Sequence, residues 1–313
     1  MKTVYVDNNA TTRVAPEVLE AMLPYFSEFY GNPSSMHFFG GQVQKKVNEA
    51  REQVADFLGA EPSEIIFTSC GTESDNTAIL GTLDSYPEKR HFITSRVEHP
   101  AVMNVSSHLS RKGYRTTEIS VDREGRLDLD ELKESIANET ALVSIMYANN
   151  ETGVLFPIEE VGEIVKSSGI PFHTDGVQAA GKIPLNMKKS TVDLLSLSGH
   201  KLHAPKGVGV LYIRKGTKFS PFMIGGHQEK GRRGGTENVP YIIGLGKACE
   251  LAKKHLGEEN TRIRAFRDYL EAKILEKVPN TLVNGDRNNR LPNTLSVSFE
   301  YVEGESILLL LSD

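Results

Sequence analysis

An apolar run ends in Ser-Gly-His-Lys within residues 195–212, which read LSLSGHKLHAPKGVGVLY. A buried ammonium group costs several kcal/mol unless it is paired or loses its proton. Lys201 therefore has two interpretations. It is either a loop lysine whose amine reaches water, or a lysine kept neutral for covalent chemistry at a carbonyl carbon. The residues that follow the other strand-like runs help to decide between them.

Polar residues follow several of those runs. The run EIIFTS at 64–69 leads into Gly71 and Thr72, and the N–H groups of such a helix start suit a phosphate. The residues after the other runs are His99, Asn150, Asp175 with Gln178, and Lys201 with Ser198 and His200. Each signal alone is weak, because helix caps, turns and structural histidines are common. In open parallel sheets, however, the carboxyl ends of the strands meet at one ligand-binding edge.

Pyridoxal phosphate is a ligand that uses all of these groups together. It needs a lysine for covalent attachment, a carboxylate at the pyridinium nitrogen, a phosphate site and a planar group over its ring. A lysine of ordinary pKa, about 10.4, is neutral in only about one molecule in a few thousand at neutral pH. Desolvation must therefore lower the pKa of Lys201, which gives the apolar setting of this lysine a chemical reason.

The pattern along the chain predicts the elements that position these residues. From about residue 63, β-rich runs alternate with amphipathic stretches, as in a mostly parallel sheet covered by helices. The seven runs lie at 64–69, 91–95, 114–120, 141–148, 170–175, 192–199 and 207–213. Two helices are expected at 239–256 and 260–277, followed by the strand-like TLVNG and NTLSVSFE. We expect an N-terminal segment packed against the small domain (1–14), a large α/β domain (15–258) and a smaller α+β domain (259–313).

Composition excludes several function classes. The 313 residues carry a formal net charge of -5, which indicates no surface for nucleic acid or anionic membranes. No signal peptide or membrane-length apolar run is present, so we expect a cytoplasmic protein. Its two cysteines, Cys70 and Cys249, predict neither a disulfide framework nor a metal site, and both are expected to be small buried or half-buried hydrophobes.

The ordered motifs resemble those of the cysteine desulfurases, pyridoxal-phosphate enzymes of the class V aminotransferase group. The matching motifs are YVDNNATT (5–12), GNPSSMH (31–37), FTSCGTESDN (67–76), VEHPAV (97–102), ANNETG (148–153), FHTDGVQAAGK (172–182), SGHKLHAPKGVGVLY (198–212) and RRGGTEN (232–238). FTSCGTES and GGHQEKGRRGGTEN are most similar to the nitrogen-fixation type. The resemblance implies fold-type I, with a seven-stranded, mostly parallel sheet in the large domain and a smaller α+β domain.

The resemblance also implies roles for single residues. Lys201 is expected to hold the cofactor covalently and to move the Cα proton, and His99 to stack on the ring and handle protons. Asp175 is expected to pair with the ring nitrogen, and Gln178 with the phenolic oxygen. The other implied roles are phosphate binding by Gly71, Thr72, Ser198 and His200, a place near the ring and the substrate carboxylate for Asn150, and contact of Thr236 with the phosphate in the partner subunit of a homodimer.

The implied activity converts L-cysteine to L-alanine and transfers the sulfur as a protein persulfide to an iron–sulfur scaffold protein, in nitrogenase-type cluster assembly. In this family the sulfur-accepting cysteine follows the helix that begins near Glu303, so the small domain is expected to be incomplete at Asp313. The 313 residues alone are then not expected to complete persulfide formation, and neither Cys70 nor Cys249 is expected to substitute. The alternatives are a selenocysteine lyase or related class V aminotransferase, and a cofactor-binding dimeric scaffold that is inactive in sulfur transfer.

Overall fold

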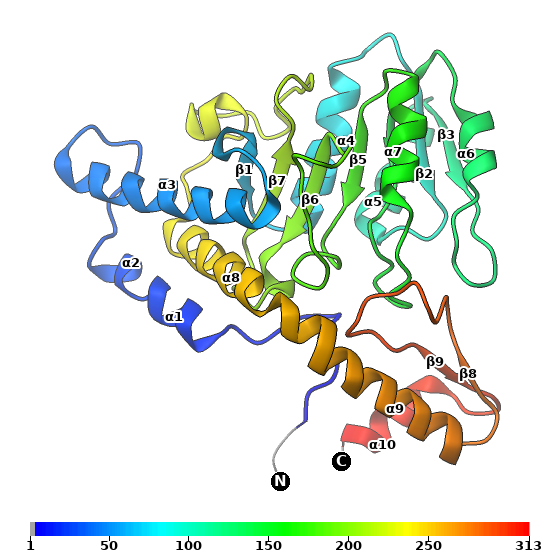
Figure 1. The fold of residues 1–313 in the computed structure, drawn as a ribbon. Coiled ribbons are helices and arrows are strands. Elements are labelled where there is room, and N and C mark those ends of the chain that lie inside the picture. The colour runs from blue at the N-terminus through cyan, green and yellow to red at the C-terminus, as the bar shows by residue number, and fades with distance from the viewer. Residues whose placement is uncertain (1–3, 313) are drawn as a thin grey trace.

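The seven β-rich runs form one sheet in the computed structural model, which describes residues 4–312 (Figure 1). The strands are β1 (Ile65–Thr68), β2 (His91–Ser95), β3 (Arg115–Ile119), β4 (Thr140–Ser144), β5 (Phe172–Asp175), β6 (Leu194–Ser198) and β7 (Gly209–Ile213). Their order is β1-β7-β6-β5-β4-β2-β3, and neighbours are parallel except where β7 pairs with β1 and β6. The predicted seven-stranded, mostly parallel sheet is confirmed.

Helices cover both faces of this sheet and bury a separate apolar core on each (Figure 1). On one face lie α3 (Phe38–Leu58), α7 (Ile158–Ser167) and α8 (Val239–Glu258), and on the other α4 (Gly71–Asp84) and α5 (Pro100–Arg111). The strands are buried throughout, except most of the edge strand β3, which explains their continuous apolar character. Three short helices complete this part: α1 (Pro16–Met22), α2 (Pro24–Ser27) and α6 (Leu129–Ser135). No helix within residues 4–312 is long and apolar enough to cross a bilayer.

The two helices expected after the sheet form one continuous rod, so the predicted break between them is wrong. A π-helical turn, Glu259–Ile263, joins α8 directly to α9 (Arg264–Lys277), as the yellow-to-orange rod of Figure 1 shows. The side chain of Asn260 donates to the carbonyls of Leu256 and Lys182, at 3.0 and 2.9 Å, and so satisfies acceptors within and beside the helix at this turn. The helix therefore continues where the sequence pattern suggested an end.

The C-terminal elements are short. The predicted strands pair as an antiparallel ribbon of β8 (Thr281–Val283) and β9 (Val297–Phe299), and α10 (Gly304–Ser312) follows. The N-terminal segment, blue in Figure 1, passes between these elements and the sheet. Its Thr12 N–H donates to the His200 carbonyl at 3.0 Å, and its Asn9 amide donates to Thr294 Oγ1 at 3.0 Å. One segment thus contacts both parts of the molecule.

The glycine-rich stretch 225–238, called the arm below, is fixed to α3 and α4 by two ion pairs. Arg51 binds the buried carboxylate of Glu229 through two contacts of 2.7 Å. Arg233 binds Glu73 at 2.7 and 3.0 Å. Such two-point contacts restrict orientation as well as distance. The basic residue Arg233 is therefore part of a structural ion pair.

Candidate active site

A large cavity, about 1290 Å³, lies at the carboxyl ends of β1, β5 and β6. Its sheet side carries Cys70, Gly71, Thr72, His99, Asn150, Asp175, Gln178, Ser198, His200 and Lys201. Its other side is formed by apolar residues of the C-terminal elements, including Phe266, Leu270, Ile274, Val297, Phe299 and Leu311. Nine of the ten predicted site residues therefore share one cavity. The tenth, Thr236, is an exposed residue of the arm and lies outside the lining of this cavity.

One end of the cavity is formed by the start of α4. A Cβ on residue 71 would lie 3.0 Å from a Val177 methyl carbon and 3.3 Å from the Ser198 Cβ, so glycine leaves space that other residues would fill. Next to it, His200 Nδ1 lies 3.0 Å from Thr11 Oγ1. Burial lowers the pKa of His200 to about 4, so its imidazole is neutral at pH 7. A helix start with hydroxyl and imidazole donors suits a bound phosphate group.

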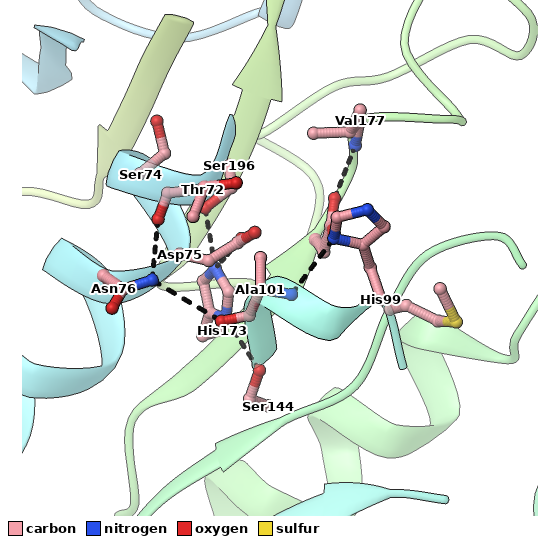
Figure 2. Close-up of polar contacts among 12 residues, drawn as sticks. Thr72, Ser74, Asp75, Asn76, His99, Ala101, Ser144, His173, Val177 and Ser196 are labelled. Carbon is pink, nitrogen blue, oxygen red and sulfur yellow. Dashed lines mark hydrogen bonds and ion pairs between the residues drawn. The ribbon is translucent and has the colours of Figure 1, made fainter. Parts of the chain in front are cut away.

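The carboxylate at the end of β5 lies deeper in the cavity. Asp175 is 6% exposed, and its Oδ1 accepts the Val177 N–H at 2.9 Å. Burial raises the pKa of Asp175, while the hydrogen bond from Val177 and the charge of Lys201 oppose this shift. His99 precedes α5 and caps its start, where its Nδ1 accepts the Ala101 N–H at 3.1 Å (Figure 2). This bond places the proton of a neutral His99 ring on Nε2.

Lys201 ends the short 3-10 helix (Gly199–Lys201) that follows β6. Its amine donates to the main-chain carbonyls of Asn9 and Ala10, the second at 2.8 Å. Burial lowers its pKa, and the carboxylates of Asp175 and Asp7 act in the opposite direction. The direction of the shift is the one that the sequence required for a lysine that reacts with a carbonyl group.

Three residues of this region were missed by the sequence reasoning. Asn9 joins several predicted residues: its carbonyl accepts from Lys201 and, at 3.1 Å, from the Gln178 amide, and its side chain donates to the Asn150 carbonyl at 3.2 Å. Asp75 and Glu98 are buried acids next to the site, at 1% and 4% exposure. The motif YVDNNATT contained a signal for Asn9, but no chemistry of its own pointed to that residue.

Glu98 is held as a buried acid beneath the cavity. Its Oε1 accepts from Ser95 Oγ at 2.7 Å and from the Met146 N–H at 2.9 Å. Its Oε2 is buried without a hydrogen-bond partner. Burial raises the pKa of Glu98 from 4.5 to about 8, because two donors do not offset the loss of water.

We expect Glu98→Gln to change how the stability of the protein depends on pH. The folded protein binds the Glu98 proton more tightly than the unfolded chain does, because the pKa is higher in the folded state. This stabilisation of the folded state is fully present below pH 4.5 and is lost as the pH rises toward about 8. Glutamine does not titrate, so the free energy of unfolding of the variant should rise relative to wild type by up to about 1.4 kcal/mol per pH unit in this window. Urea titrations at several pH values measure the difference. A difference that stays constant with pH would contradict the assignment.

The two cysteines differ in exposure. Cys70 is half-buried at the start of α4, where its Sγ accepts the Glu73 N–H at 3.5 Å. Cys249 is fully buried in α8, and burial raises the pKa of its thiol. Both match the expected small buried or half-buried side chain.

The groups on the cavity wall fit pyridoxal phosphate. A glycine cradle and helix start suit its phosphate, a buried carboxylate suits a protonated ring nitrogen, and a lysine amine of lowered pKa suits its aldehyde. The cavity volume of about 1290 Å³ leaves room for a small substrate beside the cofactor.

Comparisons with known proteins agree with this geometry. The family model described as aminotransferase class-V matches residues 4–313. A cysteine desulfurase of Trichormus azollae is 60% identical over 312 residues, and cysteine desulfurase NifS of Azotobacter vinelandii is 56% identical over 313 residues. Each alignment covers 100% of this chain and 78% of the relative.

A solved structure of a NifS-like protein is similar throughout, with a TM-score of 0.96 at 43% identity over 99% of this chain and 86% of that one. The expected fold-type I architecture is thus confirmed, and proteins of this family depend on pyridoxal phosphate. The chain belongs to the aminotransferase class-V family and, within it, to the cysteine desulfurases.

Proposed function

We propose that this protein converts L-cysteine to L-alanine and passes the sulfur on as a persulfide for iron–sulfur cluster assembly of the nitrogen-fixation type. The observation that carries the proposal is the presence of a lysine of lowered pKa and a buried carboxylate, Lys201 and Asp175, in one cavity with a helix start. Bound pyridoxal phosphate supplies an electron sink that acidifies the Cα proton of an amino acid.

The residues expected to surround the cofactor ring have separate roles. The Lys201 amine would hold the cofactor and would move the Cα proton, for which its lowered pKa is an advantage. Asp175 would favour a protonated ring nitrogen through its negative charge. His99 would lie against the ring, with its Nε2 available for proton exchange. Gln178 and Asn150, both tied to Asn9, orient the phenolic oxygen and the substrate carboxylate.

The remaining residues would hold the phosphate. Gly71 and Thr72 at the start of α4, with Ser198 and His200, would bind it through neutral donors. Phe266 and the other apolar residues of the C-terminal elements line the opposite side of the cavity.

We further propose that the protein is a homodimer. Thr236 is exposed on the arm and lies outside this chain's cavity, so it is available to the phosphate site of a second copy. Apolar side chains that a second copy could cover are exposed on α1 and α2 and just before the arm: Leu19, Leu23, Phe26, Phe222 and Ile224. An iron–sulfur scaffold protein is the proposed sulfur acceptor, and the cytoplasm, where free thiols such as Cys70 and Cys249 persist, is the proposed location.

Product analysis tests the proposed function. Protein loaded with pyridoxal phosphate is mixed with L-cysteine and an added thiol that can accept the sulfur, and alanine and the persulfide of that thiol are measured. We expect alanine to form from L-cysteine, with sulfur in equal amount on the added thiol, because neither Cys70 nor Cys249 is expected to accept it. Preference for selenocysteine would identify a selenocysteine lyase instead. Cofactor binding without alanine from either substrate would leave the inactive dimeric scaffold as the function.

A further inference from the structure

Asp75 is a fully buried carboxyl group for which the proposed reaction has no role. It lies on α4, one helical turn after Gly71, is 1% exposed and contributes to the cavity lining. Its carboxyl group is hydrogen-bonded to the Ser196 hydroxyl, while Oδ1 has no hydrogen-bond partner. An ionised carboxylate with an unpaired buried oxygen is far less stable than a protonated one.

The titratable groups that face Asp75 carry no positive charge. Asp175 and His173 approach it from β5, and Glu98 and Cys70 from the loops that precede α5 and α4. His173 Nε2 lies 3.6 Å from Asp75 Oδ1. This contact is not an ion pair at neutral pH, because burial lowers the pKa of His173 to about 3. Within residues 4–312, Asp75 therefore has a second acid beside it and no ion-pair partner that is charged at neutral pH.

Asp175 has the partners that Asp75 lacks. It accepts the Val177 N–H at 2.9 Å, and the charge of Lys201 favours its ionised form. Burial raises the pKa of both carboxyl groups, and the charge of Asp175 raises that of Asp75 further. When only one of two adjacent buried acids is ionised, the charge belongs on the one with a hydrogen-bond donor and a nearby cation.

A hydrogen-bonded chain leads away from Asp75. His173 lies between two hydroxyls, with Nε2 2.9 Å from Ser196 Oγ and Nδ1 2.8 Å from Ser144 Oγ (Figure 2). A neutral imidazole has one N–H, so the chain has two directions. If Asp75 is protonated, it donates to Ser196, Ser196 donates to Nε2, and Nδ1–H donates to Ser144. If Asp75 is ionised, every bond reverses and the His173 proton lies on Nε2.

We propose that Asp75 is a positioning residue for Asp175: it remains a neutral acid whose proton is directed to Ser196 and His173, so that the one negative charge of the pair stays on Asp175. A second carboxylate charge at this point would compete with Asp175 for the protonated ring nitrogen. The inference rests on the proposed function only in taking the ring nitrogen of the cofactor as the partner of Asp175. The protonation of Asp75 is a property of the chain itself.

Two spectroscopic measurements on the cofactor-loaded protein test this inference. Infrared difference spectra of wild type and Asp75→Asn should show one carboxylic-acid C=O band that the variant lacks. Nitrogen NMR of histidine-labelled protein, with His173 assigned through its loss in His173→Gln, should show the proton on Nδ1. The proposal is wrong if Asp75→Asn retains every carboxylic-acid band of the wild type, or if the His173 proton lies on Nε2. Both signals can also be recorded without cofactor, so their failure is distinguishable from failure of the proposed activity.

Cofactor affinity gives an independent readout. Asparagine resembles a neutral acid in shape and can donate to Ser196, so Asp75→Asn should retain the affinity for pyridoxal phosphate within about threefold. A loss of about tenfold or more in a folded variant would mean that the charge of Asp75 is used, against the proposal. Should Asp75→Asn fail to fold, Ser196→Ala serves instead. It should leave Asp75 protonated but shift its C=O band, because the acid proton loses its acceptor.

Discussion

Replacement of Lys201 by alanine is expected to lower alanine formation from L-cysteine by at least about a thousandfold, within the range that a positioned acid–base group contributes. The same amine is the group that we expect to bind the cofactor covalently. Borohydride treatment of the loaded wild-type protein should therefore leave a reduced adduct on Lys201, and Lys201→Ala should leave none. Mass spectrometry of the digested protein locates the adduct, and an amino-acid assay measures alanine.

Lys182 provides the matched control, because it also contributes to the cavity lining but has an ion-pair partner. Its amine lies 3.3 Å from Glu259 Oε1, whereas within residues 4–312 the Lys201 amine donates to the main-chain carbonyls of Asn9 and Ala10. Lys182→Ala should thus still give the borohydride adduct at residue 201. An adduct on Lys182, or a Lys201→Ala protein that still forms alanine at the wild-type rate, would refute the assignment.

Replacement of Asp175 by asparagine is expected to lower alanine formation by about a hundredfold or more, the typical loss for one preorganised electrostatic partner. Asparagine keeps the shape and still accepts the Val177 N–H, but it offers no charge to a protonated ring nitrogen. The fold should therefore persist while the absorption spectrum of the bound cofactor changes. Steady-state rates and visible spectra of the loaded variant measure the two effects.

Asp75→Asn is the matched control for Asp175→Asn. Both positions are buried carboxyl groups in contact with the cavity, and both substitutions remove one ionisable group. Only the first should alter the cofactor spectrum. Equal spectral changes in both variants would mean that the negative charge is shared, and a change in neither would remove Asp175 as the partner of the ring nitrogen.

Most of the sheet could be predicted from the sequence because its strands are buried on both faces. Continuous apolar runs such as 141–148 then mark strands without the need for alternation. The apolar pattern does not predict that β7 runs antiparallel to its neighbours β1 and β6. Only residues 199–208 separate β6 from β7, too short a connection for a helical crossover, and the strand returns antiparallel. The break predicted near residue 258 failed because a π-helical turn can absorb an irregular sequence without ending the helix.

The candidate site was predictable where a single rule applied. Residues directly after parallel strands meet at one edge, and His99, Asp175 and Lys201 follow that rule. Asp75 lies within a helix, so its position next to Asp175 follows from how α4 packs on the sheet and from no local signal. Asn9 reaches the site across more than 160 residues of sequence, and such contacts are set by the tertiary fold.

The resting position of the Lys201 amine depends on carbonyl groups of Asn9 and Ala10 that belong to the polypeptide backbone. Every amino acid brings the same carbonyl, so substitutions at these two positions can exchange side chains without removing the acceptors. Side chains at the rim of the cavity can therefore vary in evolution while the Lys201 amine keeps its two hydrogen-bond acceptors. Only an insertion, a deletion or a change in the path of the main chain would displace it.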